Sequence, residues 1–263
     1  MKASTVAALE RINRAFYSRR ASEFSDTRKQ PWPGWRRVLK LARDHLDGSR
    51  ISVLDLGCGN GRIFNELGPV LGSPKVEISY LGIDASWPLL TLAARTVAAG
   101  GWSTSRLVVA DLVHRPLAEL EAATRFDLIV NFGLMHHVPS RKARRRLLVA
   151  CAGRLRQGGV LAVSFWQFGD RERFRRRFLP WRVAAEGPPA APAAIDERDL
   201  EAGDHLLAWG DAGAVRYCHF ADEREAGALV AELGLEPLSS FLEDGGSGDL
   251  NLYKVLRKGG HNR

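Results

Sequence analysis

Short apolar runs alternate with stretches of helical periodicity along most of this chain. The runs are rich in Val, Ile and Leu and predict buried strands at 51–54, 78–84, 106–110, 126–130 and 160–166. After the first, second and fourth runs, apolar residues recur at the spacing of an amphipathic helix. Strands that alternate with helices predict a doubly wound α/β fold with a parallel sheet. A closing hairpin, formed by 235–242 and 251–257, is expected to add an antiparallel strand.

Capping and breaking residues predict where the three helices begin and end. Ser86 and Ser140 are placed to cap the second and third helices. The pair Gly68-Pro69 is expected to end the first helix, which begins at residue 62. The pair Gly158-Gly159 is expected to end the third.

Residues 1–46 predict a helical extension ahead of the alternating pattern. An amphipathic helix is expected at 4–20, with Ser4 as its cap, and a second helix at 35–46. A loop with two prolines and two tryptophans is expected between them. These tryptophans, Trp32 and Trp35, either pack over a ligand or a base, or simply cover the core.

Residues 47–258 are expected to form the main domain, which an insertion at about 167–214 interrupts. The insertion begins with a basic segment, 171–177, that is dense in arginine. It continues into an alanine- and proline-rich stretch, 184–194, which predicts a mobile loop.

The composition is that of one enzyme domain with a substantial core. The chain has 263 residues, 45% of them hydrophobic, and no apolar run approaches the roughly 18 residues that a membrane span needs. No signal peptide is recognisable, and three widely separated cysteines without a Cys-x-x-Cys pair argue against a disulfide framework or a zinc site. We therefore expect a cytoplasmic protein without a metal centre. The net charge of +8 argues only modestly for a polyanionic partner.

A glycine turn follows the first predicted strand and carries the strongest functional signal. Gly57, Cys58, Gly59 and Gly61 let the backbone turn tightly and approach a ligand closely. The dinucleotide fingerprint would need its third glycine one place later. Asp55, at the end of the strand, would repel a pyrophosphate but suits a cation such as the amino group of S-adenosylmethionine.

Acidic residues also end the next two strands, and an asparagine follows the fourth. Asp84 is placed to accept both ribose hydroxyls, and Ala85 follows it. Asp111 is placed to accept the adenine amine while Leu112 packs on the ring. Asn131 opens the loop expected to face the sulfonium methyl group.

Two adjacent histidines lie in that fourth loop. His136 and His137 either orient or deprotonate a substrate, or one of them holds the loop through backbone hydrogen bonds.

These motifs resemble those of the class I methyltransferases, whose Rossmann-like sheet has seven strands with the last antiparallel. A narrower resemblance, from about residue 13 to residue 258, is to the tRNA methyltransferases that esterify 5-carboxymethyluridine at the wobble position. It rests on six motifs: Phe24-Ser-x-Thr-Arg-Lys-x-Pro-Trp-Pro, Leu54-Asp-Leu-Gly-Cys-Gly-Asn-Gly, His136-His137, Leu155-Arg-Gln-Gly-Gly, Leu179-Pro-Trp and Arg216-Tyr-x-His. The chain departs from the family's pattern at Ala85, Cys218, Leu252 and Tyr253.

The resemblance implies S-adenosylmethionine as cofactor, tRNA as partner, and a small zinc-binding activator protein as a second partner. Arg216, Arg28 and Tyr217 are the candidates for holding the acceptor carboxylate or the nucleotide, because guanidinium groups bind carboxylate and phosphate bidentately. A carboxylate is anionic at neutral pH, so its methylation needs no general base.

Two other functions remain open on the sequence. One is a small-molecule O-methyltransferase, in which the arginine-rich segments would be solvated surface. The other is a non-catalytic RNA-binding protein with a relict cofactor fold, which the three strand-end acids disfavour.

Overall fold

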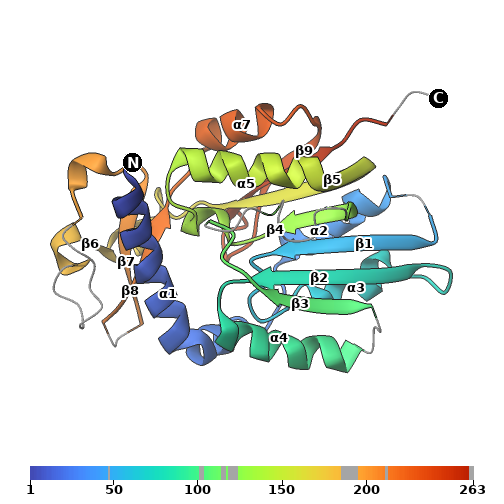
Figure 1. Cartoon of the computed structure of the whole chain (residues 1–263), viewed down its shortest axis with the longest axis horizontal. Helices are drawn as coiled ribbons and strands as arrows, with labels where there is room; N and C mark the ends of the chain where they lie inside the picture. Colours follow the sequence, from blue (N-terminus) through green and yellow to red (C-terminus); the bar gives the residue numbers. More distant parts are fainter. Residues whose placement is uncertain are drawn as a thin grey trace.

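A central sheet of seven strands organises the chain, in the order β3-β2-β1-β4-β5-β10-β9 (Figure 1). The computed structural model describes residues 1–46, 48–100, 104–113, 117, 124–184, 195–210 and 213–260. The strands are β1 Arg50–Leu56, β2 Glu77–Asp84, β3 Ser105–Val109, β4 Phe126–Asn131, β5 Leu155–Trp166, β9 Glu236–Glu243 and β10 Asn251–Arg257. The first five are parallel, and β10 runs antiparallel to both β5 and β9. The predicted fold class is therefore confirmed.

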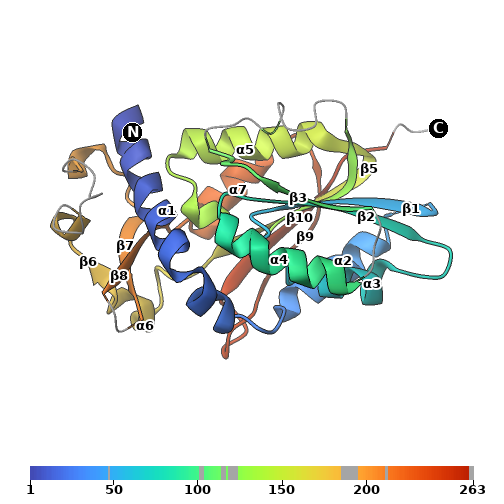
Figure 2. The same ribbon diagram turned by 60° about the horizontal axis from the view of Figure 1, so that its bottom comes forward.

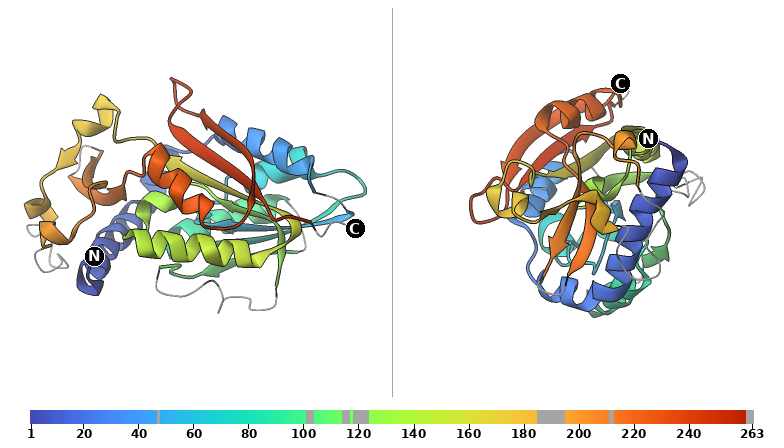
Figure 3. Two further views of the ribbon diagram at one scale, coloured as in Figure 1. Left: turned by 90° about the horizontal axis from the view of Figure 1, so that it is seen from above. Right: turned by 90° about the vertical axis from the view of Figure 1, so that its left-hand side faces the viewer.

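Helices cover both faces of this sheet because its buried strands present apolar side chains on alternate sides. From β1, Leu54 packs with α5 and α7, whereas Val53 packs with α2 and α3 on the other face (Figure 3). The helices are α1 Ala3–Asp26, α2 Pro33–Arg43, α3 Phe64–Leu71, α4 Trp87–Gly100, α5 Arg141–Arg154, α6 Glu172–Arg175 and α7 Glu223–Ala231. No helix within the described ranges is long and apolar enough to cross a membrane.

A second, three-stranded antiparallel sheet lies beside the first, and α1 packs against it (Figures 1 and 2). It consists of β6 Phe178–Leu179, β7 Asp204–Trp209 and β8 Ala214–His219. Short 3-10 turns lie at Trp181–Ala184 and Glu197–Asp199. The insertion expected at 167–214 thus supplies β6 and β7, and β8 continues the same sheet. Of the stretch expected to be a mobile loop, residues 185–194 lie outside the described part of the chain.

Two predicted helix ends were wrong, each for a local reason. Pro69 lies inside α3, because the helix runs from Phe64 to Leu71 and the proline, the sixth of its eight residues, removes only one backbone hydrogen bond. The pair Gly158-Gly159 lies inside β5, since α5 already ends at Arg154. Gly158 has φ +78°, and a Cβ on Gly159 would lie 3.1 Å from backbone oxygens of β4, so the glycines serve an irregularity in the β4–β5 pairing.

The N-terminal helix is longer than the pattern predicted, because α1 continues through Phe24 to Asp26. Its N-cap is Lys2 rather than Ser4, and no side chain caps it. The second helix begins at Pro33, a residue suited to a first helical turn, and ends at Arg43.

Candidate active site

The glycine turn joins β1 to α3 at the carboxyl edge of the sheet. Gly57 and Gly61 have φ values of +71° and +76°, and a Cβ on Gly57 would lie 2.9 Å from Leu134. The amides of Gly57 and Cys58 donate to the carbonyl of Ile83 at 2.8 and 3.1 Å, which holds the turn against β2. A Cβ on Gly59, in contrast, would meet nothing within 4 Å, although Gly59 lines a cavity. The turn is therefore a cradle that is open on its ligand side.

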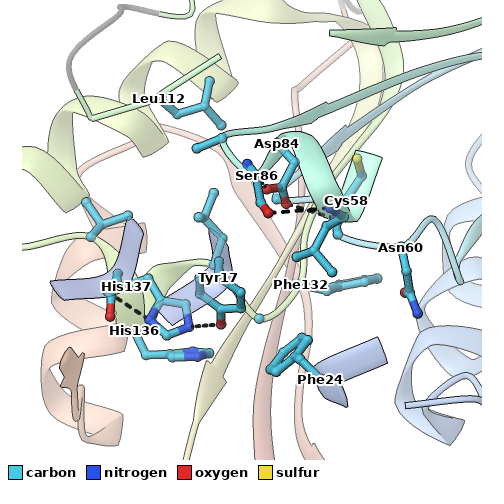
Figure 4. A pocket seen from close by; sticks show the side chains of 18 of the residues that line it. Tyr17, Phe24, Cys58, Asn60, Asp84, Ser86, Leu112, Phe132, His136 and His137 are labelled. Atoms are coloured by element: carbon cyan, nitrogen blue, oxygen red, sulfur yellow. Dashed lines mark hydrogen bonds between the residues drawn. The ribbon is translucent and has the colours of Figure 1, made fainter. Parts of the chain in front are cut away.

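This cavity has a volume of about 250 Å³ and lies outside the carboxyl ends of the strands. One wall, which we call the cofactor half, is formed by residues 57–60, 62, 84–86, 89 and 110–113. The opposite wall, the acceptor half, is formed by residues of α1, Arg28, the loop residues 132–134 and 136–138, Trp166 and Arg216. Figure 4 shows Cys58, Asp84 and Leu112 on the first wall and Tyr17, His136 and His137 across the cavity from them.

Asp84 is presented to the cofactor half by the end of β2. Its Oδ2 accepts from the amide of Gly59 at 2.9 Å, and its Oδ1 accepts from the amide of Ser86 at 2.8 Å. Burial raises the pKa of Asp84, while the backbone amides that it accepts from oppose that rise. Each carboxylate oxygen keeps a second lone pair, so the group can also accept from ligand hydroxyls. Ala85, beside it, lines the cavity as expected.

Asp111 and Leu112 lie in the same wall, where they were predicted. One oxygen of Asp111 accepts from the amide of Val113 at 3.0 Å, and the other accepts from Arg14 at 3.1 Å. This ion pair could not be predicted from a local pattern, because Arg14 belongs to α1 and lies 97 positions from Asp111 in the chain.

Asp55 lies beneath the glycine turn rather than in the cavity wall. Its carboxylate is 3% exposed and accepts from the Tyr80 hydroxyl at 2.8 Å. Burial raises the pKa of Asp55 to about 7. A direct contact between this carboxylate and a ligand amino group remains a prediction. Cys58, whose thiol pKa burial raises, does line the cavity.

Asn131 ends β4 but is fully buried behind the fourth loop. Its amide donates to the sulfur of Met135 at 3.5 Å, and it is not part of the cavity lining.

His137 holds the acceptor half together instead of facing a substrate. It lies in the 3-10 turn η1, Met135–His137. Its Nε2 lies 2.7 Å from the Tyr17 hydroxyl, and its Nδ1 lies 3.1 Å from the carbonyl of Tyr217. Nδ1 also lies 3.2 Å from the amide nitrogen of Asn13, so it either donates to the Tyr217 carbonyl or accepts from Asn13, depending on the tautomer. Burial and the nearby Arg216 lower the pKa of His137 to about 3, so the ring is neutral. This geometry favours the alternative in which one histidine fixes the loop.

His136, by contrast, lies in the cavity wall with one ring nitrogen unpaired among the described residues. It is 9% exposed and lines the cavity, and within the described ranges its Nδ1 has no hydrogen-bond partner. Burial lowers its pKa well below the ordinary histidine value, so it too is neutral. Its ring lies 5.1 Å from the ring of Trp166.

Arg216 is a buried cation without an acidic neighbour. It is 5% exposed, and no carboxylate in the described part of the chain lies within ion-pair distance of it. Its guanidinium instead lies 4.9 Å from the ring of Trp166, and its Nε has no partner among the same residues. Burying an unpaired charge is costly, so this cation calls for an anionic ligand.

Arg28 lies in the same half of the cavity, with its guanidinium 3.7 Å from the ring of Phe24. Burial, and then the charge of Arg216, lower the pKa of Arg28 to about 10. Like Arg216, it has no acidic partner among the residues described. Two adjacent guanidinium groups thus converge on one cavity.

Tyr217 does not line this cavity. Its hydroxyl donates to Asp204 at 2.7 Å, and its backbone amide donates to Asn13 Oδ1 at 2.9 Å. Successive side chains of a strand point to opposite faces, so Arg216 and Tyr217 cannot both meet a ligand from β8. Tyr217 therefore supports the site from behind.

A buried charge network lies behind Tyr217. His219 bonds to Asp204 at 2.7 Å and to Glu225 at 3.0 Å. Arg144, 1% exposed, donates to Glu225 at 2.8 Å and to Glu201 at 2.5 Å. The network joins α5, α7 and the second sheet.

Both tryptophans of the N-terminal loop line the cavity. Trp35 is also part of the core, where it stacks on Phe132 at 5.7 Å. Trp35 therefore covers the core, and the packing of either tryptophan over a ligand or a base stays a prediction.

Comparison with known proteins finds methyltransferases. Residues 54–161 match a family described as "Methyltransferase domain". Over 250 residues the chain is 28% identical to a protein of Encephalitozoon cuniculi named as a methyltransferase, covering 95% of this chain and 96% of the relative. It is 25% identical over 253 residues to the tRNA (carboxymethyluridine(34)-5-O)-methyltransferase of Schizosaccharomyces pombe, covering 92% and 94%. The 1,6-didemethyltoxoflavin-N1-methyltransferase of Burkholderia thailandensis, solved with S-adenosylhomocysteine, shares the fold, with a TM-score of 0.59, 18% identity and coverage of 94% and 88%.

The fold of the sheet, the glycine cradle and the similarity to known proteins together define an S-adenosylmethionine-dependent methyltransferase of class I. The open glycine cradle, the spare lone pairs of Asp84 and the Asp111–Leu112 wall fit this cofactor. Within that class, the chain resembles the tRNA (carboxymethyluridine(34)-5-O)-methyltransferases.

Proposed function

We propose that the protein methylates a tRNA, and that the acceptor is the carboxylate of a carboxymethyl group on the wobble uridine. The observation that carries the proposal is the pair of guanidinium groups, Arg216 and Arg28, that line the acceptor half without an acidic partner in the described ranges. A planar guanidinium binds a carboxylate bidentately. The names of two curated relatives supply the tRNA and the position.

The neutral histidines are consistent with such an acceptor. Bound S-adenosylmethionine would supply an electrophilic methyl group and leave as a neutral thioether, and Arg216 and Arg28 would hold the carboxylate that accepts this methyl group. No proton moves, so the step needs positioning and charge complementarity rather than a base. His137, with both ring nitrogens engaged and a pKa of about 3, is not suited to take a proton at neutral pH.

Methyl transfer from labelled S-adenosylmethionine to tRNA tests the proposal. We expect a labelled product that mild alkali cleaves, because an ester hydrolyses where an N-methyl group or an aryl ether survives. A label that resists alkali would contradict the carboxylate acceptor, and transfer to a free carboxylic acid but to no tRNA would favour the small-molecule alternative.

Replacement of Arg216 tests its place in the site. Arg216→Ala should lower kcat/KM for tRNA by about 10- to 150-fold, equivalent to the 1.5–3 kcal/mol of charge-assisted hydrogen bonds. Arg216→Lys should recover part of it. Affinity for S-adenosylmethionine serves as the folding control and should not change. If Arg216→Ala lowers cofactor affinity and kcat/KM for tRNA by the same factor, the role of Arg216 is structural.

Two expectations stay predictions, one from the family resemblance and one from the cysteine pattern and the lack of a recognisable signal peptide. They are the need for a small zinc-binding activator protein and the cytoplasmic location. Turnover by the chain alone tests the first.

A further inference from the structure

Two arginine-rich segments of similar composition differ in how their charges are paired. The α5 segment, residues 141–146, has five basic residues among six. The α6 segment, residues 171–177, has five arginines among seven. From the sequence both are equally suited to a polyanion.

The charges of the α5 segment are largely engaged within the protein. Arg141 and Arg145 both pair with Glu232, and Arg146 donates to a backbone carbonyl. Arg144 is buried in the charge network described above. Lys142 and Arg146 have no ion pair with a carboxylate in the described ranges. This segment therefore holds α5 to α7 and to the second sheet.

The charges of the α6 segment are mostly unpaired. Arg173, Arg175 and Arg177 are exposed, and no carboxylate in the described ranges lies within ion-pair distance of them. The pair that does form, between Arg176 and Glu172, has both side chains 76% exposed and is weak in water. The segment thus presents a net positive surface to solvent.

The α6 segment is also fixed to the acceptor half. The ring of Phe174 packs edge-to-face on Trp166 at 4.9 Å, and Trp166 lines the cavity beneath Arg216. At its other end, Arg171 pairs with Asp249 in the turn between β9 and β10. Figure 2 shows α6 at the end of the second sheet, away from α5. Free charge therefore lies next to the acceptor side, not beside the cofactor.

We propose that Arg173, Arg175 and Arg177 form the surface that binds the phosphate backbone of the acceptor RNA, while the α5 segment is structural. The inference rests on the proposed tRNA substrate and names where that substrate is held. Guanidinium groups bind phosphate bidentately, and contacts to a polyanion release counterions. Both effects act on the RNA strand whose acceptor base enters the cavity.

Two charge-matched variants test this. Arg173→Gln, Arg175→Gln and Arg177→Gln are combined in one protein, and Lys142→Gln, Arg145→Gln and Arg146→Gln in the other, so each loses three positive charges. The probe is an anticodon stem–loop RNA whose affinity is measured by fluorescence anisotropy from low to physiological salt. In wild type, log affinity should fall linearly with log salt, and each phosphate contact contributes about 0.7 to the steepness of that line. The α6 variant loses three contacts, so its slope should be shallower by about 2. The α5 variant should keep most of the wild-type slope.

The outcomes separate this inference from the proposed function. If both variants lose the same amount from the salt slope, net charge alone explains the loss and the proposal is overturned. If neither variant loses any of the slope, the α6 segment does not contact the RNA and the proposal is also overturned. Weaker binding of the α6 variant to phosphatidylserine vesicles, with RNA binding intact, would overturn it in favour of a membrane. Methyl transfer to the free carboxymethyluridine nucleoside, which has no phosphates, should be equal in all three proteins. If wild type transfers no methyl group but the α6 variant alone loses RNA affinity, the surface stands and the acceptor is wrong.

Discussion

The cofactor half and the acceptor half of the cavity are built in opposite ways. The cofactor half comes from consecutive strand-end loops between residues 57 and 113, each next to its neighbour in the chain and in the sheet. The acceptor half joins α1 to β8, whose hydrogen-bonded residues Asn13 and Tyr217 are 204 positions apart. The first half is a property of the sheet, whereas the second exists only when distant segments meet.

The two halves also differ in what holds them. Backbone amides position Asp84 in the cofactor half. In the acceptor half, side-chain contacts such as Tyr17 to His137 position the loop, and the buried network around Arg144 supports it from behind. We therefore expect single substitutions to separate cofactor binding from acceptor turnover.

Removing Arg144 should have the largest effect. Arg144→Met leaves Glu201 and Glu225 without their buried partner, which should lower the free energy of unfolding by about 3–5 kcal/mol. Arg145→Met, which breaks the exposed pair with Glu232, should cost at most about 1 kcal/mol. Denaturant unfolding measures both, and similar losses would show that burial of the network is unimportant.

Asp84→Ala should act on the other half alone. Loss of charge-assisted hydrogen bonds to the ribose should weaken S-adenosylmethionine binding by about 1.5–3 kcal/mol. Calorimetry measures this, with Glu77→Ala, at the exposed start of the same strand, as the control. Reduced RNA affinity in Asp84→Ala would contradict the separation of the two halves.

Asp55 should make cofactor binding depend on pH. Its pKa of about 7 in the folded protein means that it is largely protonated below that pH, and a cationic amino group favours the carboxylate. Binding should then release a proton, and affinity should fall by up to about tenfold per unit as pH drops below 7. Calorimetry in buffers of different ionisation enthalpy detects the proton. No release, or the same pH dependence in Asp55→Asn, would show that Asp55 does not sense the ligand charge.

A pair of hydroxyl deletions should give the smallest and most selective effects. Tyr17→Phe removes the partner of His137 Nε2 and should lower kcat/KM for the methyl acceptor by a factor equivalent to about 0.5–1.5 kcal/mol, with cofactor affinity unchanged. Tyr80→Phe removes the partner of Asp55 and should weaken cofactor binding, with kcat/KM for the acceptor at saturating cofactor unchanged. Steady-state kinetics and cofactor titration of both variants decide between selective and general effects.

The same difference explains what the sequence could predict. The five parallel strands, the glycine turn, Asp84 and Asp111 each have a local signature, which is an apolar run or a residue at a strand end. The structure brings the turn and both acids to one wall of the cavity, and their contacts with the cofactor stay predictions. That Asp55 lies under the turn could not be predicted, because it depends on Tyr80 from the neighbouring strand. The support of His137 by Asn13 and Tyr17 has no local pattern at all. Arg216 and Tyr217 were both named as residues that hold the acceptor, although successive side chains of a strand point to opposite faces of the sheet. The alternation in β8 would have excluded one of them.

The docking of α1 on β8 has a consequence for synthesis on the ribosome. The helix emerges long before β8, so during most of translation α4 is available to pack against α1 but β8 is not. The strands that form the glycine cradle can pair earlier, because they lie closer together in the chain. A nascent chain can thus possess the cradle while its catalytic cavity is still open on one side, and closure waits for β8 to leave the exit tunnel.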